Sequence, residues 1–526
     1  MRSLRRFAAL LLLLLAAGGV FAQSRWVHMG ANGRLVYART PQGDHMIDFS
    51  YAGYRGGGLA LPVVKAERTV APTGGDDSVA IQKAIDEVSK LALVDGHRGA
   101  VLLAPGVFHC AKPLTIAASG VVLRGAGWND RTGTTIALTG APHLGISVAG
   151  KMSVKATGSP TTITDAYTPS GTMVIHVADA STIHAGDTLQ IVKANAPAWV
   201  KFMGMDNLER PGVDEHWIGE DIKTLRRVAS VDGNAVTLAV PLTDDIDAKF
   251  LGGAMPPVTR VDVSGQISEV GVEGLLIKAP AKGLDYQKEA EFDGIAVKDT
   301  MDAWVSDMRF EDTTNSVRIE SGTERMTIRQ VDVEQRLAVT SAAKNFQFSC
   351  NGTQILFDRI SGKGDGLFYF ATQARQQGPV VVVHCHFDGD GHIQPHQRWS
   401  TGLLVDECEV PGGGIDLLNR GTMGSGHGWA IGWSVLWNNT AADFMVQMPP
   451  GTANWSIGDR GPHDTRPMPT SGGAKGPPLP MGVIESQGKP VEPASLYLEQ
   501  LRERLGPAAL VAIGYGPTSK AAEGPK

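Results

Sequence analysis

The feature that most constrains the fold is a spacing of 23 residues that recurs late in the chain. Cys408 lies 23 positions after Cys385, and Asn419 lies 23 positions after His396 (408 − 385 and 419 − 396). One coil of a right-handed parallel β-helix needs about this length, because three strands of ~4–6 residues and their turns bring the chain back above its start. The spacing therefore predicts that His396 and Asn419 lie side by side on neighbouring coils.

Apolar residues recur in successive sets, some 23 residues apart and some further apart, and predict five or more stacked coils around one core. The repeating sets, with a wider coil between the second and the third, are Val305, Met308 and Phe310; Ile328, Val331 and Val333; Ile355, Phe357 and Ile360; Val381, Val383, Cys385 and Phe387; Leu404, Asp406, Cys408 and Val410; Ile431, Trp433, Val435 and Trp437. Asp406 would face inward on strict alternation, so we expect a bulge or a local phase slip there.

Changes in composition along the chain predict its organisation. Arginines, an apolar run and a Val-Phe-Ala end are typical of a secretory signal peptide cleaved after Ala22. An N-cap cluster at Gly74-Gly75-Asp76-Asp77-Ser78 precedes apolar residues at helical spacing. The expected parts are a signal peptide at 1–22, an N-terminal segment and capping helix at 23–98, coils at 99–460 with a β-rich insertion at about 150–258, and a Pro/Gly-rich tail at 461–526 with a docking helix at about 493–505.

Composition limits the possible partners. The chain has 64 Gly and 30 Pro, which favour many turns over long helices, and its net charge of −6 argues against a nucleic acid partner. The apolar run at the N-terminus is too short for a membrane-spanning helix, and no later segment offers one. We expect a soluble monomer, secreted or periplasmic in a bacterium.

A resemblance to a known family rests on several segments. Gly75-Asp76-Asp77-Ser78 with its helix, the Pro105-Gly106-Val107-Phe108 turn and the strand Val121 to Gly127 resemble the start of the pectate-lyase-like superfamily of right-handed parallel β-helix proteins. Pro395 to Gly402 and Gly426 to Ala430 resemble secreted bacterial members of unassigned activity, over about 45–505. The resemblance implies the β-helix fold and an association with carbohydrate, but no catalytic residues. The calcium and Arg motifs of pectate lyases and the Asp motifs of polygalacturonase-type hydrolases are not recognisable.

Residues 384–429 concentrate the groups that could carry chemistry. They include five of the 14 histidines, and their loops hold His396, Arg398, Asn419, Arg420 and His427. Arg matches a carboxylate, and His carries protons near neutral pH, so these five are the candidate catalytic residues. The candidate substrate-binding residues are Trp399, Trp429, His384, His386 and, at a distance, Tyr286. His384 and His386 are expected to point outward beside Glu407 and Glu409, and an ordinary charge ladder would explain them equally well.

Two reactions and a binding role remain open. In β-elimination next to a uronate, His396 or His427 would take the proton, Arg398 and Arg420 would bind the carboxylate, and Asn419 would stabilise the enolate. In hydrolysis, two carboxylates would flank the bond, and the available ones are Asp365, Asp388, Asp390 and Asp416. The abundance of His, Arg and Asn favours a polysaccharide lyase over a glycoside hydrolase or a carbohydrate-binding protein.

Two further motifs each allow two interpretations. Asp388-Gly389-Asp390-Gly391-His392 could bind calcium through Asp388 and Asp390, or could simply close a turn. Cys385 and Cys408 could form a disulfide in an exported protein, although two small apolar residues in an internal ladder are the simpler interpretation.

Overall fold

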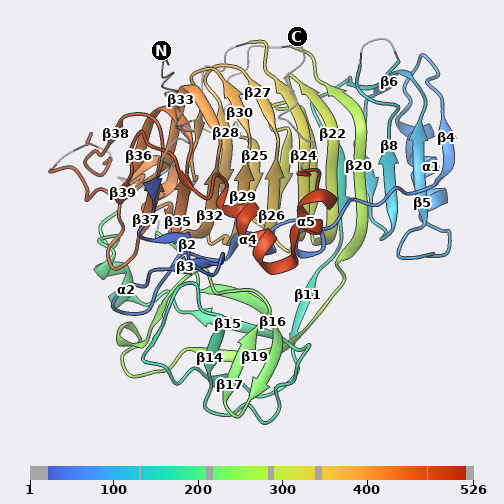
Figure 1. The fold of residues 1–526 in the computed structure, drawn as a ribbon. Coiled ribbons are helices and arrows are strands. Elements are labelled where there is room, and N and C mark those ends of the chain that lie inside the picture. The colour runs from blue at the N-terminus through green and yellow to red at the C-terminus, as the bar shows by residue number, and fades with distance from the viewer. Residues whose placement is uncertain are drawn as a thin grey trace, which may run out of the picture.

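The structure is a computed structural model, and it describes residues 22–129, 132–208, 217–281, 290–337, 346–470, 472–474 and 476–516. Parallel strands stack coil upon coil into a long β-helix, with a smaller β-domain beside it (Figure 1). The predicted parallel β-helix, its N-terminal capping helix and its β-rich insertion are confirmed. No helix among the described residues is long and apolar enough to cross a membrane.

Three parallel sheets form the sides of the β-helix. Sheet 1 contains β4 (Ala66–Val70), β5 (Gly99–Leu103), β8 (Val121–Arg124), the first parts of β20 (Ile267–Lys278), β22 (Thr300–Glu311) and β24 (Glu324–Glu334), then β26 (Thr353–Asp358), β29 (Gln377–Val383), β32 (Ser400–Asp406), β34 (Ile431–Gly432), β35 (Ser434–Trp437), β37 (Asn454–Ile457) and β39 (Val483–Glu485). Sheet 2 contains β6 (Gly106–Cys110), β9 (Thr134–Leu138), the second parts of β20, β22 and β24, then β27 (Ser361–Lys363), β30 (His386–Asp388) and the first parts of β33 (Glu409–Leu417) and β36 (Thr440–Val446). Sheet 3 contains β7 (Leu114–Ile116), β10 (Leu144–Ala149), β21 (Asp293–Lys298), β23 (Val317–Ile319), β25 (Phe346–Cys350), β28 (Phe368–Thr372), β31 (His392–Ile393), the second parts of β33 and β36, and β38 (His463–Asp464).

The 23-residue spacing sets the register where it was expected. Val305 pairs with Ile328, and Phe310 pairs with Val333. Other coils differ in length. Leu404 pairs with Val435 on sheet 1, which is 31 positions on, and Ile393 pairs with Ile415 on sheet 3, which is 22 positions on. The spacing of 23 therefore holds for some coils and not for others.

A single residue with left-handed backbone joins sheet 1 to sheet 2 in successive coils. These corner residues are Asp307, Gln330, Arg359, His384, Glu407 and Asn438, with φ between 49° and 55°. Such a residue reverses the alternation of side chains, so Val405 and Cys408 both face the core while Asp406 between them faces out. The predicted phase slip at Asp406 is confirmed. Val381, Val383 and Leu404, by contrast, lie on the outer face of sheet 1 and not in the core with Cys385.

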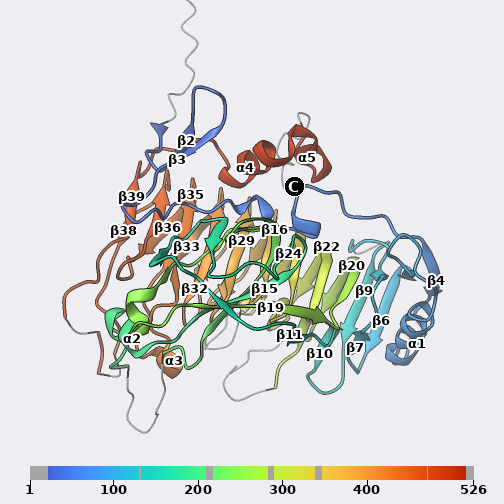
Figure 2. The same ribbon diagram turned by 90° about the horizontal axis from the view of Figure 1, so that it is seen from below.

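Both ends of the chain cover the β-helix. Helix α1 (Ser78–Val88) packs Ile81, Ile85 and Val88 onto the first coils and closes that end of the core. The N-terminal segment and the C-terminal helices cross the outer face of sheet 1 (Figures 1 and 2). The short elements of these covering segments are β1 (Ala22–Gln23), β2 (Val27–Met29), β3 (Leu35–Tyr37), η1 (Phe49–Tyr51), η2 (Tyr54–Gly56), β40 (Val491–Glu492), α4 (Leu496–Leu505) and α5 (Pro507–Ala512).

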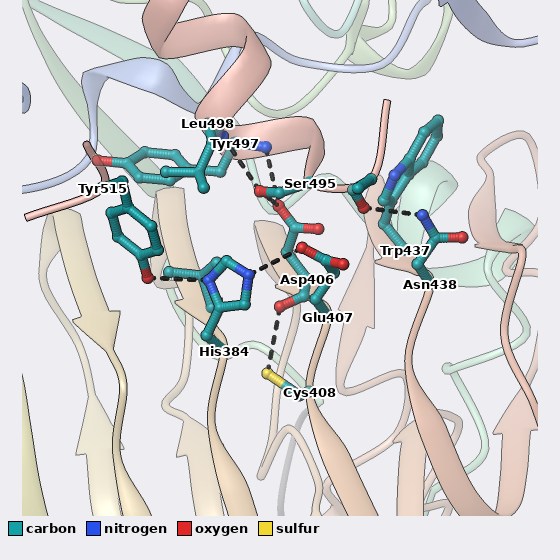
Figure 3. Close-up of polar contacts among 12 residues, drawn as sticks. His384, Asp406, Glu407, Cys408, Trp437, Asn438, Ser495, Tyr497, Leu498 and Tyr515 are labelled. Carbon is teal, nitrogen blue, oxygen red and sulfur yellow. Dashed lines mark hydrogen bonds and ion pairs between the residues drawn. The ribbon is translucent and has the colours of Figure 1, made fainter. Parts of the chain in front are cut away.

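Asp406 fixes helix α4 to sheet 1 (Figure 3). Its fully buried carboxylate accepts hydrogen bonds from Ser495 Oγ at 2.7 Å and from the Tyr497 and Leu496 amides at 2.8 and 3.3 Å. Burial, followed by the charge of Glu407, raises the pKa of Asp406 to about 7. The polar exception in the apolar repeat is therefore the anchor of the C-terminal helix.

The insertion leaves the β-helix after β10 and returns at β20. Its elements are β11 (Ser153–Ala156), β12 (Thr161–Thr162), β13 (Tyr167–Thr168), β14 (Val174–His176), β15 (Thr188–Lys193), α2 (Pro197–Phe202), β16 (Ile222–Asp232), β17 (Ala235–Leu238), β18 (Ile246–Asp247), η3 (Ala248–Leu251) and β19 (Pro257–Ser264). A hairpin at Asp232-Gly233 joins β16 and β17 in antiparallel pairing. The short helix α3 (Met423–Gly426) lies on the β-helix loops near this insertion.

Candidate functional site

His396 lies at the edge of sheet 3, after β31, in a partly exposed cluster of rings and cations. Its Nδ1 lies 3.1 Å from Gln373 Oε1, which can only accept, so Nδ1 carries the proton and Nε2 keeps its lone pair. The His427 ring meets the His396 ring edge-on at 4.6 Å, and the Phe346 ring lies 4.7 Å away. The imidazole is thus held in one tautomer, with the basic nitrogen free of that bond.

Arg420 packs against the same residue. Its Nη1 donates to the His396 carbonyl at 3.2 Å, and its guanidinium carbon lies 5.5 Å from the centre of the Phe368 ring. The side chain forms no ion pair with a described carboxylate, and Nε is buried without a hydrogen-bond partner among the described residues. Burial lowers the pKa of Arg420 to about 10, so the group remains charged at neutral pH.

The electrostatics of this cluster favour the neutral form of His396. Burial is the first cause, and His427, Arg420 and Arg398 add positive charge, so that the pKa of His396 falls to about 2. An anion bound here would reverse part of this shift, because it would stabilise the protonated imidazole. The cluster therefore combines a neutral imidazole with cations suited to an anionic group.

Two further candidate catalytic residues, Arg398 and Asn419, have different partners. Arg398 has a left-handed φ of 59° and donates through Nη2 to Ser425 O at 2.9 Å and to Ser425 Oγ at 2.6 Å, which ties it to α3. Asn419 is buried, accepts from the Gly421 amide at 2.7 Å and points its Nδ2 to Met205 of the insertion at 4.0 Å. Continuing the pairing of Ile393 with Ile415 along the chain puts Leu418, one residue before Asn419, opposite His396.

Trp399 and Trp429 do not offer the sugar-binding surface that the sequence suggested. Both are buried, with exposed fractions of 0% and 2%. Trp399 donates to Asp244 at 2.9 Å and packs 5.8 Å from the Trp199 and Trp217 rings, while Trp429 donates to the Met203 carbonyl at 3.0 Å. These partners come from the insertion, so both rings join the insertion to the β-helix.

His384 and His386 form the outward column that was expected, at the junction of sheets 1 and 2. His384 lies 2.8 Å from Glu407, and His386 lies 3.1 Å from Glu409. His384 also contacts Tyr515 Oη at 2.8 Å beneath the C-terminal segment (Figure 3). Burial opposes the charged form of His384, but the hydrogen bond and charge of Glu407 outweigh it and raise its pKa. Neither residue belongs to the His396 cluster.

The remaining predicted positions lie elsewhere. Asp388 is mostly exposed and lies 3.5 Å from His386, and Asp390 accepts from the Gly366 amide at 2.5 Å, as a turn residue does. No group of three acidic, His or Cys side chains placed to hold a metal occurs in the described part of the chain. Tyr286 lies outside the described residues.

A second polar group on sheet 3 was largely missed. His392 Nδ1 lies 2.9 Å from Asp416 Oδ2, Gln394 donates to the same oxygen at 2.5 Å, and Asp416 Oδ1 is buried without a described partner. Asp443 follows on the next coil, and burial together with Asp416 raises its pKa. Gly414 lies between His392 and Asp443, where a Cβ would come within 2.6 Å of the His392 ring. A fixed spacing of 23 residues does not predict Asp443 as a neighbour, because the coil before it is wider.

Comparisons with known proteins give structural likeness at low identity. No family model and no curated protein matches the sequence. Among solved structures, the tailspike protein gp49 from Pseudomonas phage LKA1 is 12% identical, with a TM-score of 0.35 over 78% of this chain and 74% of that one. The tailspike protein of E. coli bacteriophage HK620, in complex with a pentasaccharide, is 9% identical, with a TM-score of 0.41 over 85% of this chain and 62% of that one.

Proposed function

We propose that the protein is an exported, monomeric, carbohydrate-active enzyme of the pectate-lyase-like superfamily, which cleaves an acidic polysaccharide by β-elimination next to a uronate. The observation that carries the proposal is the pairing of His396 with Arg420. One supplies a neutral imidazole of fixed tautomer, and the other a buried guanidinium without a described carboxylate partner.

Each residue then has a distinct role. Arg420, with Arg398 beside the cluster, would bind the uronate carboxylate and neutralise the charge that develops on it. His396 Nε2 would take the proton on the carbon next to that carboxylate. The C–H electrons form the new C=C bond, the bond to the glycosidic oxygen breaks, and that oxygen takes a proton from water.

Substrate binding would adjust the strength of the base. In the free protein, burial and neighbouring cations hold the pKa of His396 at about 2. A bound carboxylate places negative charge beside the same cations and raises this pKa, so the imidazole becomes a better proton acceptor when the substrate is present.

Hydrolysis is the second candidate, because Asp416 and Asp443 occupy different environments. Asp416 is paired with His392 at 2.9 Å, whereas burial and Asp416 raise the pKa of Asp443. A carboxylate held by an imidazole, next to a carboxyl group whose pKa is raised, fits a base and an acid. In this reaction Asp443 would protonate the leaving oxygen.

Incubation with uronate polymers separates the candidates. Ultraviolet absorbance from a C=C bond conjugated to the carboxylate would support elimination, new reducing ends without it would support hydrolysis, and retention alone would indicate a binding protein. For elimination, His396→Ala should lower kcat by about 10²–10³-fold, while Asp443→Asn should change it by less than about threefold. The exposed Lys83→Met on α1 serves as a control. Full activity in His396→Ala would refute this assignment.

A further inference from the structure

A polar pocket of about 480 Å³ opens where sheet 2 turns toward sheet 3. Its described side chains come from three consecutive coils and are Glu334, Gln335, Arg336, Lys363, Asp365 and Asp388. Neither His396 nor Arg420 lines it. Its volume falls within the ~300–1,000 Å³ that small-ligand sites usually occupy.

Two glycines form the backbone wall of this pocket. Gly364 and Gly389 have φ values of 147° and 125°. A Cβ on Gly389 would lie 2.3 Å from the Gly364 carbonyl, and a Cβ on Gly364 would lie 2.7 Å from the Gln335 Cβ. The coils therefore approach too closely here for any side chain larger than hydrogen.

Some of the lining charges are already neutralised by neighbours. Arg336 bonds to Asp312, and Glu334 accepts from Arg309 Nη2 at 2.6 Å. Lys363 and Asp365 are exposed and form no side-chain hydrogen bond or ion pair with any described residue. These two side chains remain available to a ligand, one as a donor and the other as an acceptor.

A buried amide provides an independent indication of a ligand. Gln335 is 6% exposed, and its Oε1 is buried without a hydrogen-bond partner among the described residues. A buried acceptor of this kind carries a free-energy cost unless something donates to it. Lys363, Asp365 and Gln335 thus offer donors and acceptors on different coils of one pocket.

We propose that this pocket is a subsite for a neutral, hydroxyl-rich sugar residue. Hydroxyl groups both donate and accept, so one such residue can donate to Asp365 and to Gln335 Oε1 while it accepts from Lys363. Glu334, Asp365 and Asp388 outnumber Arg336 and Lys363, which disfavours an acidic sugar here. The inference rests on the proposed function for the polymer: a neutral sugar would bind here, and a uronate near Arg420.

Saturation-transfer NMR on the full-length protein tests the pocket without requiring catalysis. The probes are D-glucose, D-galactose and N-acetyl-D-glucosamine, with D-glucuronate as the acidic comparison. We expect at least one neutral sugar to bind, and Lys363→Met and Asp365→Asn each to weaken it by about tenfold. Lys83→Met and the exposed Asp262→Asn are matched controls that should leave binding unchanged.

The outcomes distinguish this inference from the proposed function. With an active polymer, Lys363→Met should raise KM about tenfold and change kcat by less than about twofold. One outcome would overturn the subsite alone. In it, His396→Ala abolishes activity, but Lys363→Met and Asp365→Asn change neither sugar binding nor KM. Sugar binding that depends on Lys363 in a protein without elimination activity would support the subsite and refute the proposed function. Tighter binding of D-glucuronate than of every neutral probe would overturn the chemical class.

Discussion

The outer faces of sheets 1 and 3 share one core but carry opposite chemistry. On sheet 1, Val381, Val383 and Leu404 point outward and are buried beneath the two chain ends. On sheet 3, the outward residues His392, Gln394 and His396 are polar and partly exposed. Alternation along a strand decides which residues point outward, but what covers a face decides whether they are apolar. In this β-helix, the face that the terminal segments cover is apolar, and the uncovered face is polar.

The comparison predicts that Arg420 is a residue of function and not of stability. Arg420→Met should lower the rate of elimination by about 10²–10³-fold, because it removes the cation for the carboxylate. The free energy of unfolding should stay unchanged or rise, since a buried guanidinium without a described ion pair is replaced by an apolar side chain. Denaturant unfolding and polymer assays measure the two effects.

Arg309→Met is the matched control for this variant. Arg309 lies on sheet 2 and pairs with Asp332 at 3.0 Å and Glu334 at 2.6 Å. We expect it to lower the free energy of unfolding by about 1 kcal/mol or less and to leave the rate intact. A loss of several kcal/mol in Arg420→Met would contradict the division between the two faces.

Asp406 on sheet 1 should show the opposite behaviour. Asp406→Ala leaves Ser495 Oγ and two amides at the start of α4 without their acceptor, so we expect the free energy of unfolding to fall by about 2–4 kcal/mol. Activity of the folded protein should be unchanged. Chemical unfolding checks this, with the exposed Asp262→Ala as a control within about 0.5 kcal/mol of wild type. Equal stability of the two variants would show that Asp406 does not hold α4.

The pH dependence of stability should differ in sign between the faces. Burial raises the pKa of Asp406 from 3.8 to about 7, so between these values the folded state binds a proton that the unfolded state has lost. Its contribution is complete below the unfolded pKa and is lost as the pH rises toward 7, by at most about 1.4 kcal/mol per pH unit. Asp406→Asn should remove this decline, measured as unfolding free energy across that range. An unchanged profile would contradict the assignment.

His396 should contribute a slope of the other sign. Burial and three cationic neighbours lower its pKa from 6.5 to about 2, so between these values the unfolded state binds a proton that the folded state does not. The contribution of His396 to the free energy of unfolding rises with pH up to about its pKa in the unfolded state, again by at most about 1.4 kcal/mol per pH unit. His396→Gln should flatten this rise in the same titration of unfolding free energy. Asp406→Asn is the comparison variant, because it should leave the increase of unfolding free energy with pH that comes from His396 unchanged.

The sequence allowed the coils to be predicted because their repeat is local. Apolar residues at a fixed spacing identified the β-helix, and the outward pairs of His384 with Glu407 and His386 with Glu409 follow from it. The spacing failed where coils differ in length, as between Ile393 and Ile415, which are 22 residues apart, and across the wide coil before Asp443. A periodic pattern predicts neighbours only while every coil has the same length.

Contacts between distant segments could not be predicted in this way. Trp399 and Trp429 stand in polar loops and resemble binding residues, but Trp199, Trp217 and Met203 of the insertion bury them. Asp406 interrupts an apolar repeat because it binds the start of α4, which lies about 90 residues further along the chain. His396 and Arg420 were both named as candidates because they stand in polar loops of the same wall, but their contact was not predicted.

The smallest expected effect is that of a reductant on stability, and it concerns two cysteines in the core between sheets 1 and 3. Cys385 and Cys408 are buried free thiols, which donate to the Val383 carbonyl at 3.3 Å and to the Asp406 carbonyl at 3.5 Å. Burial raises the pKa of Cys408, so its reactive thiolate is scarce in the folded protein. A reductant should therefore change the free energy of unfolding by less than about 0.5 kcal/mol, and thiol labelling should require unfolding. A disulfide between them would instead make reduction cost about 2–4 kcal/mol, which chemical unfolding with and without reductant would reveal. The stability of the core shared by sheets 1 and 3 would then depend on a covalent bond as well as on packing.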